Sequence, residues 1–342
     1  MNLKKFARQD TTLIVLIFIT LVVFLVLWWI LGKQFFSLNN FQSMGYQIPE
    51  FGFLALAMAV TMLTGGIDLS VVANANLAGI LAAFVLTRRF DFFANFSEPA
   101  LVVTACLVAL FVAAVAGLFN GLLISKLSVP PILATLGTMT FFNGISMAIT
   151  SGEGVVGFPE MFLNIGSGAV GNIPLIFILF IIASLVVGFM LERTSTGLGV
   201  YLYGENRIAA LFAGLRTENL IIRVYFLSGL LSGFASIIMI SRFNSAKVGY
   251  GDTYLLQAIL VSVLGGIAPE GGRGRVLGVV LGIFILQALQ SAFTLFAFTP
   301  YAKKLIWGSM LLLVMVINFV IDRWRSRSRK FVLEQEPATT NP

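Results

Sequence analysis

The chain has 342 residues, of which 58% are hydrophobic and only 11% are charged, and it contains no histidine. Soluble globular proteins carry roughly 25% charged residues, so this composition excludes them and indicates a polytopic membrane protein. The net charge of +7 does not indicate nucleic acid binding, because the basic residues flank apolar runs, where they orient a chain in a bilayer. With one cysteine, Cys106, and few carboxylates, the chain lacks the residues of a metal site or a hydrolytic centre, and we expect neither.

Apolar runs of about 20 residues predict ten membrane-spanning helices and an all-α fold. The predicted spans are 12–32, 46–65, 69–87, 99–124, 131–150, 172–191, 220–241, 254–268, 276–297 and 303–321. The first run is too long for the apolar core of a signal peptide, so we expect it to remain uncleaved. Residues 12–321 are then one transmembrane domain, between a cytoplasmic N-terminus (1–11) and a basic, disordered cytoplasmic tail (322–342).

The lysines and arginines predict that both termini are cytoplasmic. With the N-terminus inside, fifteen basic residues fall in cytoplasmic segments and seven, among them Arg242, in outer segments. The spans themselves hold little charge: Asp68 lies near the middle of an apolar run, and Glu50 lies near the outer end of the second span. Ion-coupled transporters place several ionisable groups in the membrane, so this scarcity indicates that energy enters from elsewhere.

The stretch "TGGIDLS", Thr64–Ser70, interrupts a nearly continuous apolar region. Its two glycines break the helix, and Asp68 or Ser70 is placed to cap the next one. Two interpretations are compatible: a structural cap and turn, or a broken helix that lines a solute path.

Amides supply most of the polarity inside the predicted spans, and they suit a neutral, hydroxyl-rich solute because they carry no charge to desolvate. The candidate pathway residues, with Asp68, are Asn74, Asn76, Asn120, Asn143, Gln257, Gln287 and Gln290. For any one of them, hydrogen bonding between helices is the competing interpretation. Gln287 and Gln290 are three residues apart on one helix face, which favours a shared cavity for this pair.

Three segments carry small residues at the spacing that allows close helix packing: "GLFNG" (117–121), "SGLLSG" (228–233) and "GVVLG" (278–282). This pattern indicates packing and not activity.

The loop 192–219 is the largest internal cytoplasmic connection, and it contains "GENRIAALFAGLRTE". A short helix is expected from Asn206, its cap, to Ala213, with Gly214 ending it. Ile208, Leu211 and Phe212 share one face of that helix, and Ala209 and Ala210 allow close approach. Surface-bound membrane helices normally carry several lysines, whereas this one has only Arg207, so a docking site for a cytoplasmic protein is favoured.

Four blocks together resemble the inner-membrane permease subunits of bacterial ribose/xylose/galactose-type ABC importers, over about residues 40–325. The blocks are "GGIDLSV" (65–71), "VPPILATLGTMTFFNGI" (129–145), "GENRIAALFAGL" (204–215) and "VLGGIAPEGGRGRVLGVVLG" (263–282). The resemblance implies ten helices with an inverted repeat that relates spans two to five to spans seven to ten. It also implies that the third block is a coupling helix seated on an ATPase subunit, with contacts expected at Gly204, Glu205, Asn206, Ala209, Ala210 and Gly214.

The resemblance further implies the partners: a second copy or a related permease, two ATP-binding subunits, and a periplasmic or lipid-anchored solute-binding protein. The permease chains themselves are expected to contact membrane lipid. This chain itself has no Walker A motif and holds no cofactor, since ATP belongs to the partner subunit. Asn143, Gln287 and Gln290 depart from residues common in relatives, which leaves the solute open among a pentose, hexose, polyol or sugar-like signalling molecule.

Three alternatives remain at this point. A branched-chain amino acid permease has similar architecture, although "GGIDLS" favours sugar. A secondary transporter or channel is disfavoured by the scarcity of membrane carboxylates and by the coupling-like loop. A membrane enzyme needs an acid, base or nucleophile cluster that the sequence lacks.

Overall fold

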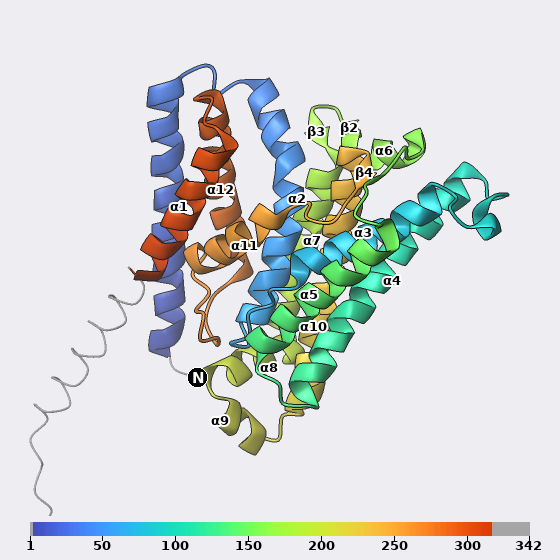
Figure 1. Ribbon diagram of the computed structural model, residues 1–342. Helices are drawn as coiled ribbons and strands as arrows, with labels where there is room; N and C mark the ends of the chain where they lie inside the picture. Colours follow the sequence, from blue (N-terminus) through green and yellow to red (C-terminus); the bar gives the residue numbers. More distant parts are fainter. Residues whose placement is uncertain (1–2, 317–342) are drawn as a thin grey trace, which may run out of the picture.

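The structure, a computed structural model, describes the backbone of residues 3–316 and the side chains of residues 13–316. The described chain is mostly helical with very little sheet, which confirms the all-α fold class (Figure 1). The α-helices are α1 (Leu3–Leu31), α2 (Leu38–Met62), α3 (Val71–Leu86), α4 (Glu98–Ser125), α5 (Pro131–Thr150), α6 (Glu160–Ser167), α7 (Leu175–Arg193), α8 (Ser195–Glu205), α9 (Arg207–Phe212), α10 (Thr217–Phe243), α11 (Asp252–Leu264) and α12 (Val276–Leu295). The strands form two short antiparallel pairs, β1 (Val155–Val156) with β4 (Ser245–Ala246) and β2 (Ala169–Val170) with β3 (Ile173–Pro174).

Each predicted span coincides with a helix, although the tenth is described only as a helical stretch over 300–316. Six described helices are long and apolar enough to cross a bilayer, and α3 and α11 are shorter apolar helices. α2 belongs to neither group because Gln47 and Glu50 make its first half polar. The predicted tail, 322–342, lies outside the described residues, and the predicted N-terminal segment, 1–11, is part of α1 from Leu3 onward.

The core is formed by α2, α3 and α10. Other helices surround these three, so most of their side chains are buried. α2 is buried without interruption from Ile48 to Met62, and α3 along nearly its whole length. α10 packs against α4, α2 and α3, while α11, α12 and α7 cover the rest of α2. In Figure 1, α1 and α12 stand at one side of the molecule, and α3, α4 and α5 run obliquely at the other.

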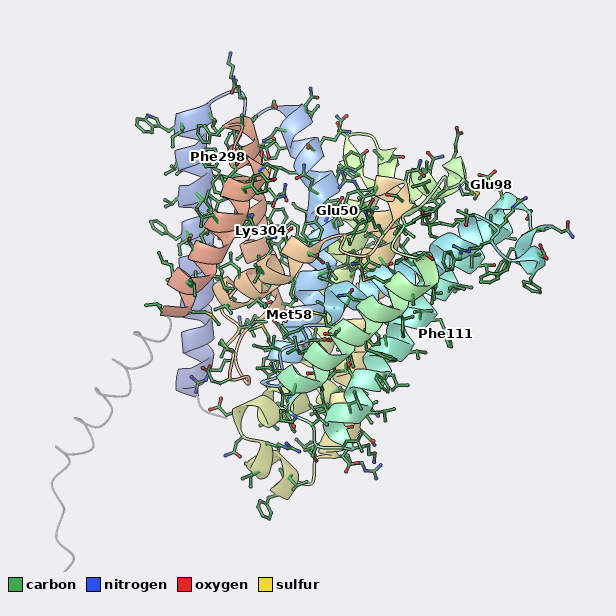
Figure 2. The ribbon with its side chains drawn as sticks, viewed as in Figure 1. Glu50, Met58, Glu98, Phe111, Phe298 and Lys304 are labelled. Atoms are coloured by element: carbon green, nitrogen blue, oxygen red, sulfur yellow. The ribbon has the colours of Figure 1, made fainter. Side chains whose placement is uncertain are left out.

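The outer helices expose apolar side chains, as expected of surfaces that face hydrocarbon. Trp29 of α1 has 85% of its surface exposed. Phe111 of α4, labelled in Figure 2, has 69% of its surface exposed. Their faces therefore suit lipid or another membrane subunit.

Glycine contacts hold α4 against α10, as the small-residue spacing predicts. A Cβ on Gly117 would lie 2.8 Å from the Cα of Gly229, and a Cβ on Gly229 would collide with the carbonyl oxygen of Ala113. Two of the predicted motifs thus pack against each other. The third places Gly278 of α12 against the backbone of Gly265, where a Cβ would also collide.

We predict that Gly117→Val separates α4 from α10 and lowers the free energy of unfolding by about 1–3 kcal/mol, the usual effect of overpacking. Thermal unfolding of the detergent-solubilised protein measures the effect. Gly137→Ala is the matched control, because nothing lies within 4 Å of a Cβ at Gly137 on α5. Equal unfolding temperatures for the two variants would show that the α4–α10 contact is not needed.

Candidate functional site

The break between α2 and α3 is held by the carboxylate of Asp68, which is buried. Its Oδ1 accepts hydrogen bonds from the backbone N–H of Ser70 at 3.0 Å and from Ser70 Oγ at 2.7 Å. Its Oδ2 accepts from Ser228 Oγ of α10 at 3.0 Å, and Asn120 Nδ2 of α4 donates to Ser70 Oγ at 2.7 Å. Asp68 therefore ties the start of α3 to α4 and α10, as a buried charge requires when hydrogen bonds replace water.

Asp68 and Ser70 were both candidates to cap α3, and each fulfils part of that role. The N-cap of α3 is Ser70, whose side chain makes no capping hydrogen bond, while Asp68 binds the N–H of Ser70 itself. Gly65, at φ +75°, makes the predicted break. These hydrogen bonds give Asp68 the structural role expected of a cap and turn. Its carboxylate is buried in this conformation.

The candidate amides fall into two groups, and among the described residues no hydrogen bond joins them. The first group lies on α3, α4 and α5: Asn74, Asn76, Asn120 and Asn143. The second lies on α11 and α12: Gln257, Gln287 and Gln290. A single cluster of all seven is therefore not formed.

The first group contains polar atoms that lack a partner. Asn74 Nδ2 donates to the carbonyl oxygen of Ala113 at 3.1 Å, whereas its Oδ1 has no partner. Asn76 Nδ2, Asn120 Oδ1 and Asn143 Oδ1 are likewise buried without a hydrogen bond. Such atoms destabilise a fold by about 1–3 kcal/mol each, which suggests a role in another state of the protein.

Gln287 and Gln290 bond to two different helices, so the two side chains share no hydrogen-bond partner. Gln287 Nε2 donates to Gln47 Oε1 of α2 at 3.1 Å. Gln257 Nε2 of α11 donates to Gln290 Oε1 at 3.4 Å. On a helix, residues three apart are about 60° apart in direction, which is enough for each to meet a separate neighbour.

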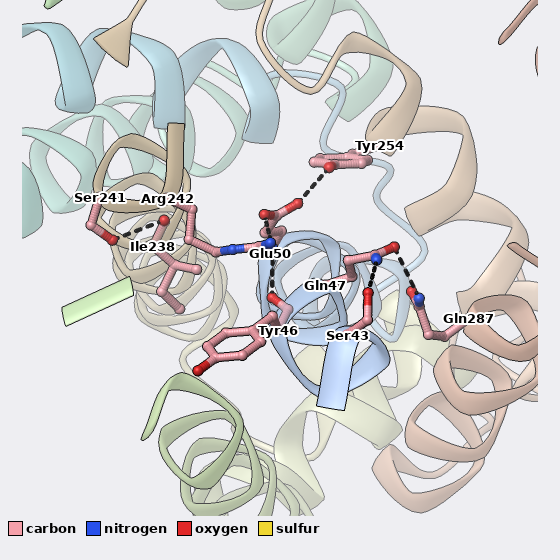
Figure 3. Close-up of polar contacts among 9 residues, drawn as sticks. All are labelled: Ser43, Tyr46, Gln47, Glu50, Ile238, Ser241, Arg242, Tyr254 and Gln287. Atoms are coloured by element: carbon pink, nitrogen blue, oxygen red, sulfur yellow. Dashed lines mark hydrogen bonds and ion pairs between the residues drawn. The ribbon is translucent and has the colours of Figure 1, made fainter. Parts of the chain in front are cut away.

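An ion pair between Glu50 and Arg242 joins α2 to α10, and sequence reasoning missed it (Figure 3). Tyr254 of α11 donates to Glu50 Oε2 at 2.7 Å, and Arg242 Nη1 also donates to the carbonyl oxygen of Tyr46 at 2.8 Å. Only 5% of the Glu50 side chain and 24% of that of Arg242 are exposed. Arg242 is thus a structural partner and not simply an orientation signal of an outer loop. The available signal was two opposite charges near the outer ends of spans two and seven, which are otherwise almost uncharged.

The short helix predicted within the 192–219 loop is present as α9. Asn206 is its N-cap and accepts the N–H of Ala209 at 3.0 Å, while Gly214, at φ +78°, follows its end. Ile208, Leu211 and Phe212 are exposed by 67%, 60% and 86%, so the apolar face predicted for docking is free.

Ala210 was also expected to face a partner, but it is buried within the chain. A side chain in that position stabilises the loop and does not reach the outer surface. Ala209 is exposed, as a contact residue must be.

The segment before α9 contacts the end of α2 and the 265–275 loop, which connects α11 to α12, through glycines. A Cβ on Gly204 would collide with the carbonyl oxygen of Leu63 and the N–H of Gly272, and Gly272 itself donates to Leu63 O at 2.9 Å. An ion pair between Arg273 and Glu205 at 3.3 Å lies beside this junction. The ends of α8, α2 and the 265–275 loop therefore form one packed unit, here called the glycine junction.

Tyr201 of α8 adds a further link, since its hydroxyl donates to the carbonyl oxygen of Gly274 at 3.0 Å. Burial, reinforced by the negative charge of Glu192 and opposed by Arg275, raises the pKa of Tyr201 to about 12. The hydroxyl therefore stays protonated and keeps donating at physiological pH.

Comparison with known proteins identifies related sequences over most of the chain. A family model described as "Branched-chain amino acid transport system / permease component" matches residues 40–315. The ribose import permease protein of Bacillus subtilis (strain 168) is 32% identical over 90% of this chain and 92% of its own length. No solved structure matches the chain.

Two further relatives show the range of the similarity. The autoinducer 2 import system permease protein of Yersinia pestis (strain Pestoides F) is 30% identical over 84% of this chain and 80% of its own length. The ribose import permease protein of Haemophilus influenzae is 31% identical over 88% of this chain and 91% of its own length.

We predict that Glu50→Ala lowers the free energy of unfolding by about 3 kcal/mol, because Arg242 is left partly buried without its counter-charge. Glu218→Ala is the control, since the Lys126–Glu218 pair is exposed by 55% and 54% and is expected to contribute at most about 1 kcal/mol. Thermal unfolding in detergent compares the two. A Glu50 variant as stable as the Glu218 variant would mean that the buried pair does not join α2 to α10.

We predict that Gly204→Ala opens the glycine junction and destabilises the protein by about 1–3 kcal/mol, since its methyl group has no space. Gly199→Ala, also on α8, is the control, because its Cβ would meet only Leu220 at an ordinary 3.4 Å. Limited proteolysis of the 192–219 loop reports the junction directly. Identical cleavage rates in both variants would refute the packed unit.

Proposed function

The chain belongs to the branched-chain amino acid transport system / permease component family, and on that premise we propose that it moves a sugar or sugar-like solute into the cell. It does so as the membrane subunit of an ATP-driven importer whose ATPase is a separate chain. The observation that carries the solute class is the similarity over most of the chain to ribose and autoinducer 2 import permeases. A branched-chain amino acid is not favoured, because these relatives are named for other solutes.

The chemistry of the buried polar residues supports a neutral solute. The acidic residues that are buried in the described part of the chain, Glu50 of α2 and Asp68 of the α2–α3 break, are occupied by internal hydrogen bonds or an ion pair. The amides of α3, α4 and α5 retain unpartnered atoms. A neutral polyhydroxylated molecule bonds to amides without a counter-charge, whereas a zwitterion needs one for each of its two charges.

The exposed apolar face of α9 is the proposed seat of the ATPase subunit. Phe212 and Ile208 project from the chain, and the glycine junction connects α9 to the ends of α2 and of the 265–275 loop. A displacement of α9 by an ATPase would thus reach the helices that contain the candidate amides. In Figure 1, α9 lies at the same end of the molecule as the start of α1, which supports the proposal that both lie on one side of the membrane.

The rest of the importer follows the same proposal: two permease chains, as a homodimer or a heterodimer, two ATP-binding subunits, and a solute-binding protein on the outer side. The apolar faces of α1 and α4 are available to lipid and to the second permease. Both termini are proposed to be cytoplasmic.

We predict that Phe212→Asp abolishes ATP-dependent uptake and loses the ATPase during affinity purification in mild detergent, because a charge replaces the most exposed apolar contact of α9. Phe212→Leu is the matched control and keeps both properties. Amounts in the membrane should be equal for both variants, since Phe212 is 86% exposed and does not support the fold.

Purification of the unmodified chain without any ATPase, combined with uptake that needs no ATP, would contradict the importer itself. Retention of the ATPase by Phe212→Asp would contradict only the role of α9.

A further inference from the structure

A crevice between α3 and α10 is lined by two of the unpartnered buried polar groups. Asn76 Nδ2 of α3 and Ser236 Oγ of α10 are 94% and 99% buried by residue, and neither atom has a hydrogen bond. Both residues line the crevice together with Met239, Lys247 and Tyr250. These two buried polar atoms lie on adjacent helices beside one crevice, and a hydrogen-bonding ligand would satisfy both.

We propose that this crevice is an outer solute subsite within a single permease chain, and that Asn76 and Ser236 bind hydroxyl groups of a neutral polyhydroxylated solute. The inference rests on the proposed function and names the residues that act in it.

The chemistry of the lining selects for such a solute. Asn76 offers an amide donor, Ser236 a hydroxyl that donates and accepts, and Lys247 an ammonium at the exposed edge. Tyr250 and Met239 add an aromatic and an apolar wall. No carboxylate lines the crevice, so the ammonium group of an amino acid would lack a counter-ion, and the charge of Lys247 repels cations.

The position fits entry from the outer side. Ala246, on the rim, belongs to β4, which follows the end of α10 and pairs with β1 through Val155. The crevice is too narrow for a water molecule here, so solute binding requires α3 and α10 to separate. Gly79 shows how closely they approach, since a Cβ there would lie 2.8 Å from Ser236 Oγ.

Further unpartnered polar atoms lie toward the α2–α3 break, on α3, α10 and the neighbouring α4. They are Asn74 Oδ1 of α3, Asn120 Oδ1 of α4 and the hydroxyl of Tyr225 of α10. Tyr225 lies eleven residues before Ser236, or about 16 Å along α10. A Cβ on Gly66, in the break, would lie 2.6 Å from the Tyr225 hydroxyl. Together with the subsite, these atoms form a row of hydrogen-bonding groups that extends from the outer end of α10 to the α2–α3 break, next to the glycine junction.

Cysteine labelling tests the proposal in the full chain produced with its partner subunits. The single native cysteine is removed by Cys106→Ser, and Asn76→Cys is treated with a membrane-impermeant maleimide at rest, during turnover and after trapping with vanadate. Ala78→Cys is the matched control, because Ala78 is on the same helix and fully buried. Ser236→Cys, nearly isosteric, repeats the test if Asn76→Cys does not reach the membrane.

We expect Asn76→Cys to react during turnover while Ala78→Cys does not. D-ribose, D-xylose, D-galactose and D-glucitol serve as probes, and at least one should protect. At roughly ten times its Kd, a protecting sugar slows labelling about tenfold, because occupied protein does not react.

Equal labelling of Asn76→Cys and Ala78→Cys in every state would overturn the subsite, and so would labelling that is not slowed by a probe which the importer transports. Failure of the importer itself is recognised separately, since it appears in the unmodified chain as uptake without ATP and purification without an ATPase.

Discussion

The hydrogen bonding of the Asp68 carboxylate is the interaction on which the rest of the structure depends. A helix broken inside a membrane exposes backbone groups that water cannot reach, so each break must be satisfied by the protein itself. Asp68 does this at the start of α3, and it draws Ser228 of α10 and, through Ser70, Asn120 of α4 to the same point. The carboxylate thereby places three helices around one break, and the crevice and the row of unpartnered groups lie along those same helices.

The glycine junction contacts the end of α2, directly before that break. Gly204 and Gly272 let backbone meet backbone, without side chains that would absorb a displacement by changing rotamer. A push on α9 therefore reaches Leu63, at the end of α2, through rigid contacts. The exposed apolar face of α9 and the buried polar residues of α3 and α10 are in this way parts of one connected structure.

Patterns within a single helix were predictable from the sequence. The spans, the break at Gly65, the cap at Asn206 and the packing of Gly117 all follow from local composition and spacing, because length, φ preference and side-chain size act on neighbouring residues. The apolar face of α9 followed from the same periodicity.

Partnerships between helices were not predictable, since they depend on how the helices are rotated and tilted. Counting Arg242 as a loop charge hid its pairing with Glu50, and adjacency of Gln287 and Gln290 did not imply one shared neighbour.

The exposed tip of α9 also bears on how the complex is produced in the cell. Phe212, at 86% exposure, with Leu211 and Ile208 beside it, forms an apolar surface that lipid does not cover if α9 lies in the cytoplasm. Such a surface invites aggregation or degradation when nothing is bound to it. Permease chains made in excess of the cytoplasmic partner would then be degraded quickly. The supply of that partner would set how many complete importers accumulate.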